Sequence, residues 1–192
     1  TESGIVDVVA DETAIYAKIR ELVTMLPGNN EDDASSEDCT DDLNRVCADL
    51  ANCVGDTSIA LSTIADNNAF FEVKENFAKD MVTGFIRLNG ITVGCVANRT
   101  EVYSAEGEVT DKYDAVLSAD GCEKAADLIN FCDAFDIPVL SLTNVKGYAS
   151  TKCAEKKMAK AAARLTYAFA NATVPKVNVI TLKAMGSAYV AM

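Results

Sequence analysis

The chain has 192 residues, of which 49% are hydrophobic and 24% are charged, and this composition is typical of a globular protein and not of a disordered one. Its 29 acidic and 17 basic residues give a formal net charge of −12, which argues against sequence-independent nucleic-acid binding because such binding depends on neutralising phosphates. There is no histidine, which excludes Ser–His and Cys–His catalysis and nearly every catalytic zinc site from this chain, and we expect no metal site.

The first third of the chain is predicted to contain helices separated by an acidic stretch. Apolar residues at helical spacing predict a helix that begins at Asp11 and ends at residues 27–30, where proline and glycine interrupt the pattern. Residues 31–42 are rich in acidic side chains and serine, which is typical of a solvated linker. A helix capped by Thr40 and a short helix over residues 59–65 are expected next, followed by a domain boundary.

Strands and helices alternate from residue 67 onward. The predicted elements are strands over residues 70–73, 82–88 and 91–97, a helix over 121–135, a strand over 137–143, a loop over 144–150, a helix over 152–171 and a buried strand over 176–182. Asn89-Gly90 is a strong hairpin signal between two of these strands, whereas the polar residues 101–119 suggest only a short strand over 115–117. The alternation predicts an α/β layered core with parallel strand pairing.

Cysteine usage favours a reducing compartment. The seven cysteines are an odd set that lies mostly among apolar neighbours and contains no C-x-x-C motif. No apolar run reaches about 18 residues, and the first residues lack the basic-then-apolar order of a signal peptide. We therefore expect a cytoplasmic protein.

The most informative stretch follows the strand over residues 176–182. A turn is predicted over residues 183–185, and Gly186, Ser187 and Ala188 then begin a helix. Their small side chains leave the first backbone N–H groups of the helix approachable, at the positive end of the helix dipole and without a helical partner. Such a turn suits a carbonyl oxygen that becomes negative during a reaction, although an ordinary β–α connection has the same appearance.

A second loop is expected close to this turn. Gly147 and Tyr148 follow the preceding core strand, and ligands of parallel sheets gather beyond the carboxyl ends of the strands. The two loops can therefore direct two backbone donors at one oxygen, which is the geometry of an oxyanion hole.

A basic stripe stands out in this acidic chain. Lys156, Lys157, Lys160 and Arg164 lie on one face of the helix over residues 152–171. The stripe is either a solvated helix face or a contact for coenzyme A phosphates or for an acidic subunit surface.

Six segments, in the order of the chain, carry a family resemblance. They are LPGNN at 26–30, VTGFIRLNG at 82–90, VGCVAN at 93–98, FCDAFDIPVL at 131–140, YAFANATVPK at 167–176 and VITLKAMGSAY at 179–189. Together they resemble the carboxyltransferase subunit of biotin-dependent acyl-CoA carboxylases, which the sodium-pumping acyl-CoA decarboxylases share. The resemblance covers nearly the whole chain.

The resemblance implies a fold and a domain organisation. The fold would be α/β and crotonase-like, built from repeated ββα units, and family subunits carry two such domains in a longer chain. Residues 1–30 would be the end of the N-terminal carboxyltransferase domain, 31–66 an acidic linker with short helices, and 67–192 a C-terminal carboxyltransferase domain that is incomplete at its C-terminus.

It also implies a chemistry and a site. A carboxyl group would move between carboxybiotin and the α-carbon of a short acyl-CoA, such as propionyl-CoA or acetyl-CoA, with the help of backbone oxyanion holes. Ser187 and Ala188 would donate N–H groups to the ureido carbonyl of biotin, Gly186 would allow its approach, and Gly147 with Tyr148 would line the other side. The contacts to the cofactor would be made by Ser187, Ala188, Tyr189 and Val190.

Partners follow from the same resemblance. They are a biotin carboxyl carrier protein or biotin carboxylase subunit, the acyl-CoA, and further copies of the chain, which form hexamers in the family. Contact with a membrane would be only indirect, through a sodium-pump decarboxylase. This segment alone would be inactive.

Four departures from the family pattern keep other functions open. The loop at residues 146–151 lacks the usual Pro-Gly-Phe-Leu-Pro-Gly, and residues 157–163 of the following helix stand in place of a common Gly-x-x-x-His-Gly-Ala pattern. Ser187 replaces a common glycine, and Val190 stands where propionyl-CoA enzymes often have an acidic residue. One alternative is a diverged, non-catalytic assembly subunit. Another is a crotonase-type acyl-CoA hydratase or hydrolase, which needs catalytic carboxylates where the loops offer none nearer than Glu155.

Overall fold

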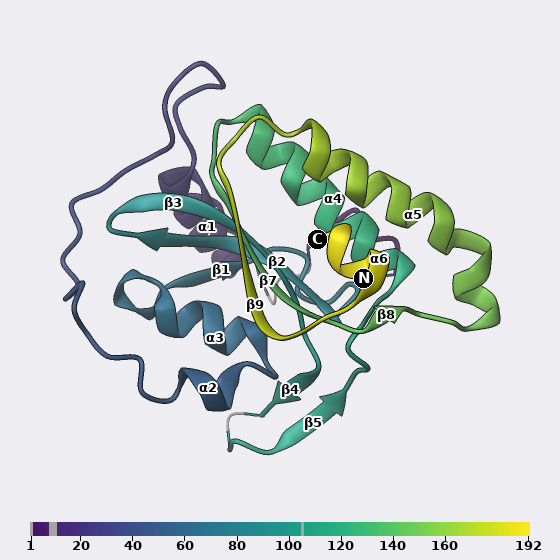
Figure 1. The fold of residues 1–192 in the computed structure, drawn as a ribbon. Helices are drawn as coiled ribbons and strands as arrows, with labels where there is room; N and C mark the ends of the chain where they lie inside the picture. Colours follow the sequence, from purple (N-terminus) through teal and green to yellow (C-terminus); the bar gives the residue numbers. More distant parts are fainter. Residues whose placement is uncertain (1, 8–10, 105) are drawn as a thin grey trace.

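The computed structural model describes residues 2–7, 11–104 and 106–192. It contains a five-stranded sheet in the order β1-β2-β3-β7-β9, with helices on both faces (Figure 1). The strands are β1 (Phe70–Glu72), β2 (Met81–Leu88), β3 (Ile91–Asn98), β7 (Val139–Val145) and β9 (Lys176–Ala184). The first three strands pair antiparallel, and β3, β7 and β9 pair in parallel. The predicted α/β core with parallel pairing is therefore confirmed.

Two small sheets accompany the large one. Strands β4 (Glu101–Tyr103) and β5 (Val109–Lys112) form an antiparallel pair within the polar stretch that the sequence left unassigned. Strands β6 (Val116–Leu117) and β8 (Gly147–Tyr148) pair in parallel. The segment expected to be a loop after residue 143 therefore holds the end of β7 and all of β8.

The parallel part of the fold repeats one unit. A long strand of the large sheet is followed by a short strand of the β6–β8 sheet and then by a helix, first as β3, β6 and α4 (Ala119–Ala134), with the β4–β5 pair inserted after β3, and again as β7, β8 and α5 (Lys152–Asn171). This repetition is the ββα pattern of the crotonase-like fold, as expected from the sequence. It brings the connections that follow β7 and β9 to the same edge of the sheet.

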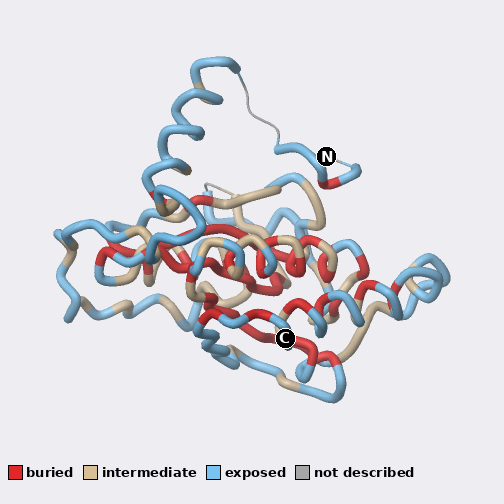
Figure 2. The backbone as a smooth tube through the Cα atoms, turned by 90° about the horizontal axis from the view of Figure 1, so that it is seen from above, coloured by how far each residue is buried: buried red, intermediate tan, exposed pale blue. Residues whose placement is uncertain are grey.

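Apolar packing holds one helical layer on each face of the sheet. Helices α4 and α5 lie together on one face, where residues such as Phe85, Ile129 and Leu165 are almost completely buried (Figures 1 and 2). Helix α3 (Thr57–Ile64) covers part of the other face through Leu61, beside the turn η1 (Asp66–Asn68). The core therefore lies between the sheet and these helices.

The hairpin between β2 and β3 turns at Asn89-Gly90, as predicted. Both residues have positive φ angles, 52° for Asn89 and 78° for Gly90, which a two-residue hairpin turn of this kind requires. The buried carboxylate of Asp66 accepts the backbone N–H groups of Asn89 at 3.1 Å and of Gly90 at 2.6 Å. The segment before the sheet is thus attached to the hairpin; the domain boundary placed near Asp66 stays a prediction.

The N-terminal helices differ in how well they were predicted. Helix α1 (Glu12–Met25) begins after Asp11, whose side chain accepts the N–H of Ala14, and it is exposed along most of its length (Figure 2). The prediction of a helix from Thr40 is wrong, because residues 41–49 consist of turns and irregular backbone and only α2 (Leu50–Cys53) is helical.

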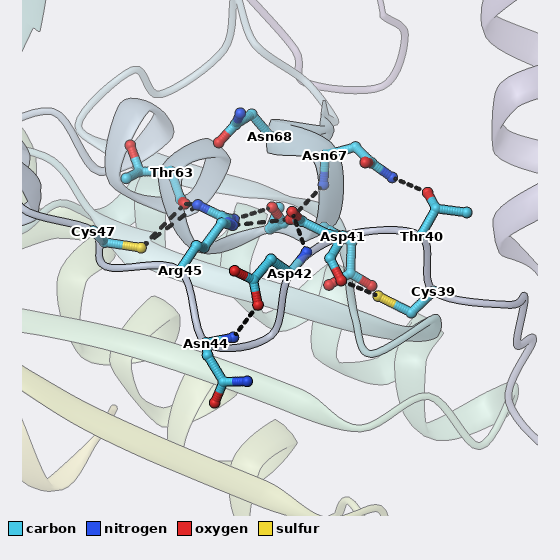
Figure 3. A network of polar contacts seen from close by, with 12 residues as sticks. Cys39, Thr40, Asp41, Asp42, Asn44, Arg45, Cys47, Thr63, Asn67 and Asn68 are labelled. Atoms are coloured by element: carbon cyan, nitrogen blue, oxygen red, sulfur yellow. Dashed lines mark hydrogen bonds and ion pairs between the residues drawn. The ribbon is translucent and has the colours of Figure 1, made fainter.

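Long-range contacts replace that helix. The Arg45 guanidinium donates to the carbonyl oxygens of Thr63 at 2.7 Å and Ala65 at 2.6 Å, and its Nε lies 2.9 Å from the Asp41 carboxylate (Figure 3). Asp41 also accepts the N–H of Asn67, and this bond, with Arg45, lowers the pKa of Asp41. The two side chains therefore bind the end of α3 instead of beginning a helix of their own.

The last strand is a second correction. The apolar run over residues 176–182 was expected to be a buried strand, but β9 is the edge strand of the sheet and is largely exposed. Val177 and Leu182 have 59% and 62% of their surface exposed. An apolar run predicts a strand correctly, but its burial depends on whether another element covers it, and among the described residues no helix covers this part of β9.

Candidate functional site at the ends of β7 and β9

Two connections meet where β7 and β9 end. The N–H of Met185, directly after β9, donates to the carbonyl oxygen of Val145, the last residue of β7, at 3.0 Å. β8 then carries Gly147 and Tyr148, and the helix α6 (Gly186–Val190) packs on it. The structure thus brings together the two loops that the sequence singled out.

The α6 turn depends on a glycine. Gly186 has a φ of +63°, in the left-handed region, and a methyl group added to it would meet no atom within 4 Å. Glycine is therefore required here by backbone conformation and not by crowding. Ser187 is exposed and Ala188 is buried, and both N–H groups lie in the first helical turn, where an α-helix provides no carbonyl partner.

Tyr148 connects the two loops directly. Its hydroxyl donates to the carbonyl oxygen of Ser187 at 3.1 Å. Burial raises the pKa of Tyr148, assisted by the nearby Cys122, so the phenol keeps its proton at neutral pH and can donate. This contact holds β8 against the start of α6.

A hollow of about 490 Å³ opens beside the Gly147 loop and is lined by Asp114 and Val116 and by residues 146–151. Lys146 Nζ lies 3.2 Å from the Asp114 carboxylate within it. Asp114 therefore places a carboxylate beside the Gly147 loop, where the sequence analysis indicated none nearer than Glu155. The Asp114 side chain is 77% exposed and is paired with Lys146. An exposed, paired carboxylate is not in the environment of a buried general acid.

The other residues named from the sequence lie around this site. Tyr189 and Val190 follow on α6, and Val190 is exposed. The basic stripe of α5 is on the surface, where Lys157 lies 3.9 Å from Asp120 and Arg164 lies 2.6 Å from Asp127. Two of its four cations are thus paired with carboxylates of α4.

Two buried asparagines at this edge were not singled out from the sequence. Asn98, at the end of β3, and Asn144, near the end of β7, have 2% and 4% of their surface exposed. Each bonds to the backbone of a neighbouring strand. The available signal was positional, since both amides stand at carboxyl ends of adjacent parallel strands.

The described part of the chain has neither a cluster of metal ligands nor a membrane-spanning helix. Among residues 2–7, 11–104 and 106–192, no group of three or more His, Cys, Asp or Glu residues is placed to hold a metal ion. Over the same ranges no helix is both long and apolar enough to cross a membrane.

Comparison with known proteins identifies the family. The "Carboxyl transferase domain" family matches residues 1–192. The propionyl-CoA carboxylase beta chain of Roseobacter denitrificans is 38% identical over 190 residues, which are 95% of this chain and 35% of that protein. The methylmalonyl-CoA decarboxylase subunit alpha of Propionigenium modestum is 35% identical over 190 residues, with the same two coverages.

A solved structure agrees with these relatives. The transcarboxylase 12S crystal structure, described as a hexamer with hydrolysed methylmalonyl-coenzyme A bound, has a TM-score of 0.83 and 32% sequence identity to this chain. The match covers 96% of this chain and 35% of the transcarboxylase chain. The chain therefore spans about a third of the length of the relatives that it matches. By its sequence and its fold, it belongs to the carboxyl transferase domain family.

Proposed function

We propose that this protein takes part in carboxyl transfer between carboxybiotin and the α-carbon of a short acyl-CoA, and that the α6 turn binds the ureido carbonyl oxygen of biotin. The observation that carries the proposal is the meeting of the β7 and β9 connections, where Tyr148 holds the turn that presents the N–H groups of Ser187 and Ala188. The similarity to propionyl-CoA carboxylase and methylmalonyl-CoA decarboxylase subunits supports the reaction class.

The residues at the turn suit this cofactor. A ureido carbonyl is a neutral acceptor, and the turn offers backbone donors with open space beside Gly186 and Gly147. Bound carboxybiotin supplies the carboxyl group: in the net reaction its N–C bond breaks, a C–C bond forms at the acyl α-carbon, and the α-proton takes the place of the carboxyl group on nitrogen. The N–H groups of Ser187 and Ala188 stabilise negative charge on the oxygen that they bind, and one such donor is worth about 10²–10³-fold in rate.

No side-chain acid or imidazole is required for this role. Backbone donors fixed before the reaction stabilise charge without being titrated, so they act over a broad pH range. Tyr148 maintains the turn through its bond to Ser187 and stays protonated at neutral pH. A chain without histidine can therefore perform this part of the reaction.

The proposal includes partners and a compartment. A biotin carrier or biotin carboxylase subunit would deliver the cofactor, and the hexameric transcarboxylase 12S, whose structure contains hydrolysed methylmalonyl-coenzyme A, supports an oligomer that acts on a short acyl-CoA. All seven cysteines are free thiols, which is compatible with a reducing compartment such as the cytoplasm.

The test is biotin-dependent decarboxylation by the full-length protein with free biotin and, in turn, malonyl-, methylmalonyl- and glutaconyl-CoA. Ser187→Pro removes one N–H donor in the first helical turn and should lower turnover by about 10²–10³-fold. Ser187→Ala keeps that N–H and serves as the matched control, so it should retain activity. A folded oligomer without turnover of any of these substrates would contradict the proposal and favour a non-catalytic assembly subunit.

A further inference from the structure

The pairing of β7 with β9 is irregular just before the α6 turn. Thr143 pairs with Ile180, but Val145 pairs with Ala184, so two steps along β7 correspond to four along β9. The edge strand therefore bulges outward over residues 181–183. Bulges of this kind re-aim the chain that follows them and recur next to active sites.

Side-chain hydrogen bonds between β7 and β9 fill this bulge. The Asn144 amide oxygen accepts the backbone N–H of Lys183 at 3.2 Å. The Thr181 hydroxyl donates to the carbonyl oxygen of Thr143 at 3.2 Å. Only two residues separate Lys183 from Gly186, so the bond to Asn144 fixes the backbone directly before the turn.

Asn144 is itself fixed by Asn98. The Asn98 amide nitrogen donates to the carbonyl oxygen of Asn144 at 2.5 Å, and the Asn98 amide oxygen accepts the N–H of Asn144 at 2.6 Å. Both side chains are nearly inaccessible, with 2% and 4% of their surface exposed. A buried amide that satisfies both its donor and its acceptor in this way holds one orientation, because losing either bond leaves a buried polar group unpaired.

We infer that Asn98 and Asn144 are positioning residues for carboxyl transfer: Asn98 fixes the backbone of Asn144, and Asn144 fixes the bulge of β9 that places the N–H groups of Ser187 and Ala188. This inference rests on the proposed function of the α6 turn. The side-chain hydrogen bonds of the two asparagines go to Asn144 and Lys183 and not to residues 186–190, so each acts through Lys183 and the chain that follows it.

The two asparagines have different chemical requirements. The bond from Lys183 needs only an acceptor on residue 144, which an aspartate also provides. Asn98 must donate as well as accept, and leucine, which has a similar shape, can do neither. Removing the amide should therefore be harmful at both positions, whereas aspartate at position 144 keeps an acceptor in either protonation state and should restore part of the function.

The experiment measures transfer kinetics and backbone amide exchange on the full-length protein at pH 8. The variants are Asn144→Leu, Asn144→Asp and Asn98→Leu. Asn178→Leu is the matched control, because Asn178 is an exposed residue of β9 that accepts one bond, from Thr143, ahead of the bulge. Free biotin and the acyl-CoA that the wild type decarboxylates are the substrates.

Asn144→Leu and Asn98→Leu should lower kcat about a hundredfold, the scale of a misplacement of about 1 Å, with little change in KM for the acyl-CoA. Both should speed amide exchange over residues 183–190, whereas Asn178→Leu should resemble the wild type in both measurements and Asn144→Asp should lie between Asn144→Leu and the wild type. Equal kinetics and exchange for Asn144→Leu and Asn178→Leu, or for Asn98→Leu and Asn178→Leu, would overturn the inference. If the wild type shows no transfer, the proposed function fails, and the exchange measurement alone decides the role of the asparagines.

Discussion

Lys124 offers a sharp test of the energetics of this fold, because a lysine is rarely buried. Only 1% of its surface is exposed, and its ammonium group on α4 donates to the carbonyl oxygens of Phe77 at 2.8 Å and Met81 at 2.7 Å. The charged groups that face it are Glu72 on β1 and Arg99, Asp80 and Asp7 from other segments. Burial lowers the pKa of Lys124 from 10.5 to about 8, against the opposing influence of the carboxylates.

The direction of the pH effect follows from proton binding. The unfolded chain holds the Lys124 proton up to pH 10.5, whereas the folded chain releases it near pH 8, so the unfolded state binds more protons between these values. Stability therefore rises with pH across this window. The full interval corresponds to about 3 kcal/mol, of which about 1 kcal/mol is gained between pH 7 and pH 9.

The assay is urea unfolding at pH 7 and pH 9, followed by far-ultraviolet circular dichroism because the chain has no tryptophan. Lys124→Met removes the titrating group and keeps the length of the side chain, so the wild type should gain about 1 kcal/mol relative to this variant between the two pH values. Groups common to both proteins cancel in the comparison, and repeating it in a Glu72→Gln background removes the buried carboxylate that faces Lys124. A difference between wild type and variant that is the same at pH 7 and pH 9 would refute the reasoning.

Two further predictions concern stability. Arg45→Met should lower the free energy of unfolding in urea by about 2 kcal/mol, because the carbonyl oxygens of Thr63 and Ala65 lose their charged donor. The control Arg164→Met breaks only an exposed ion pair and should lower it by less than about 1 kcal/mol. Equal losses for the two variants would contradict this account. Gly186→Ala should lower the free energy of unfolding by about 1–2 kcal/mol, because residue 186 has a left-handed backbone conformation. The control Gly147→Ala should be nearly neutral, since a methyl group there also meets no atom within 4 Å and φ is not positive. A neutral Gly186→Ala would show that the turn is not constrained.

Elements whose signals are local were predicted well. The Asn89-Gly90 turn specifies its own hairpin, because two adjacent residues with positive φ angles determine the direction of both strands. Helix α5 occupies the predicted residues 152–171, since its apolar stripe and its neighbouring turns lie within one continuous segment. The information for these elements does not depend on distant parts of the chain.

The helix expected from Thr40 failed for a tertiary reason. Leu43 and Val46, which belonged to its apolar stripe, are 62% and 85% exposed and so gain nothing from a helical arrangement. Asp41 and Arg45 instead bond to η1 and to the end of α3, about 20 residues further along the chain. A cap and a periodic stripe predict a helix only where a surface is available to bury the stripe.

The candidate site shows which part of a function is readable from a sequence. The two loops were predictable because carboxyl ends of parallel strands share one edge, so residues that follow successive core strands must lie near each other. The bond between Asn98 and Asn144 joins positions 46 residues apart, and the bulge that it supports depends on the register of β7 against β9. Register is a pairwise property of two strands, and neither strand specifies it alone. A polar residue that ends an otherwise apolar strand is therefore an informative sequence feature. If such a residue is buried, its side chain must hydrogen-bond to a neighbouring strand, and that bond helps to determine where the following loop lies.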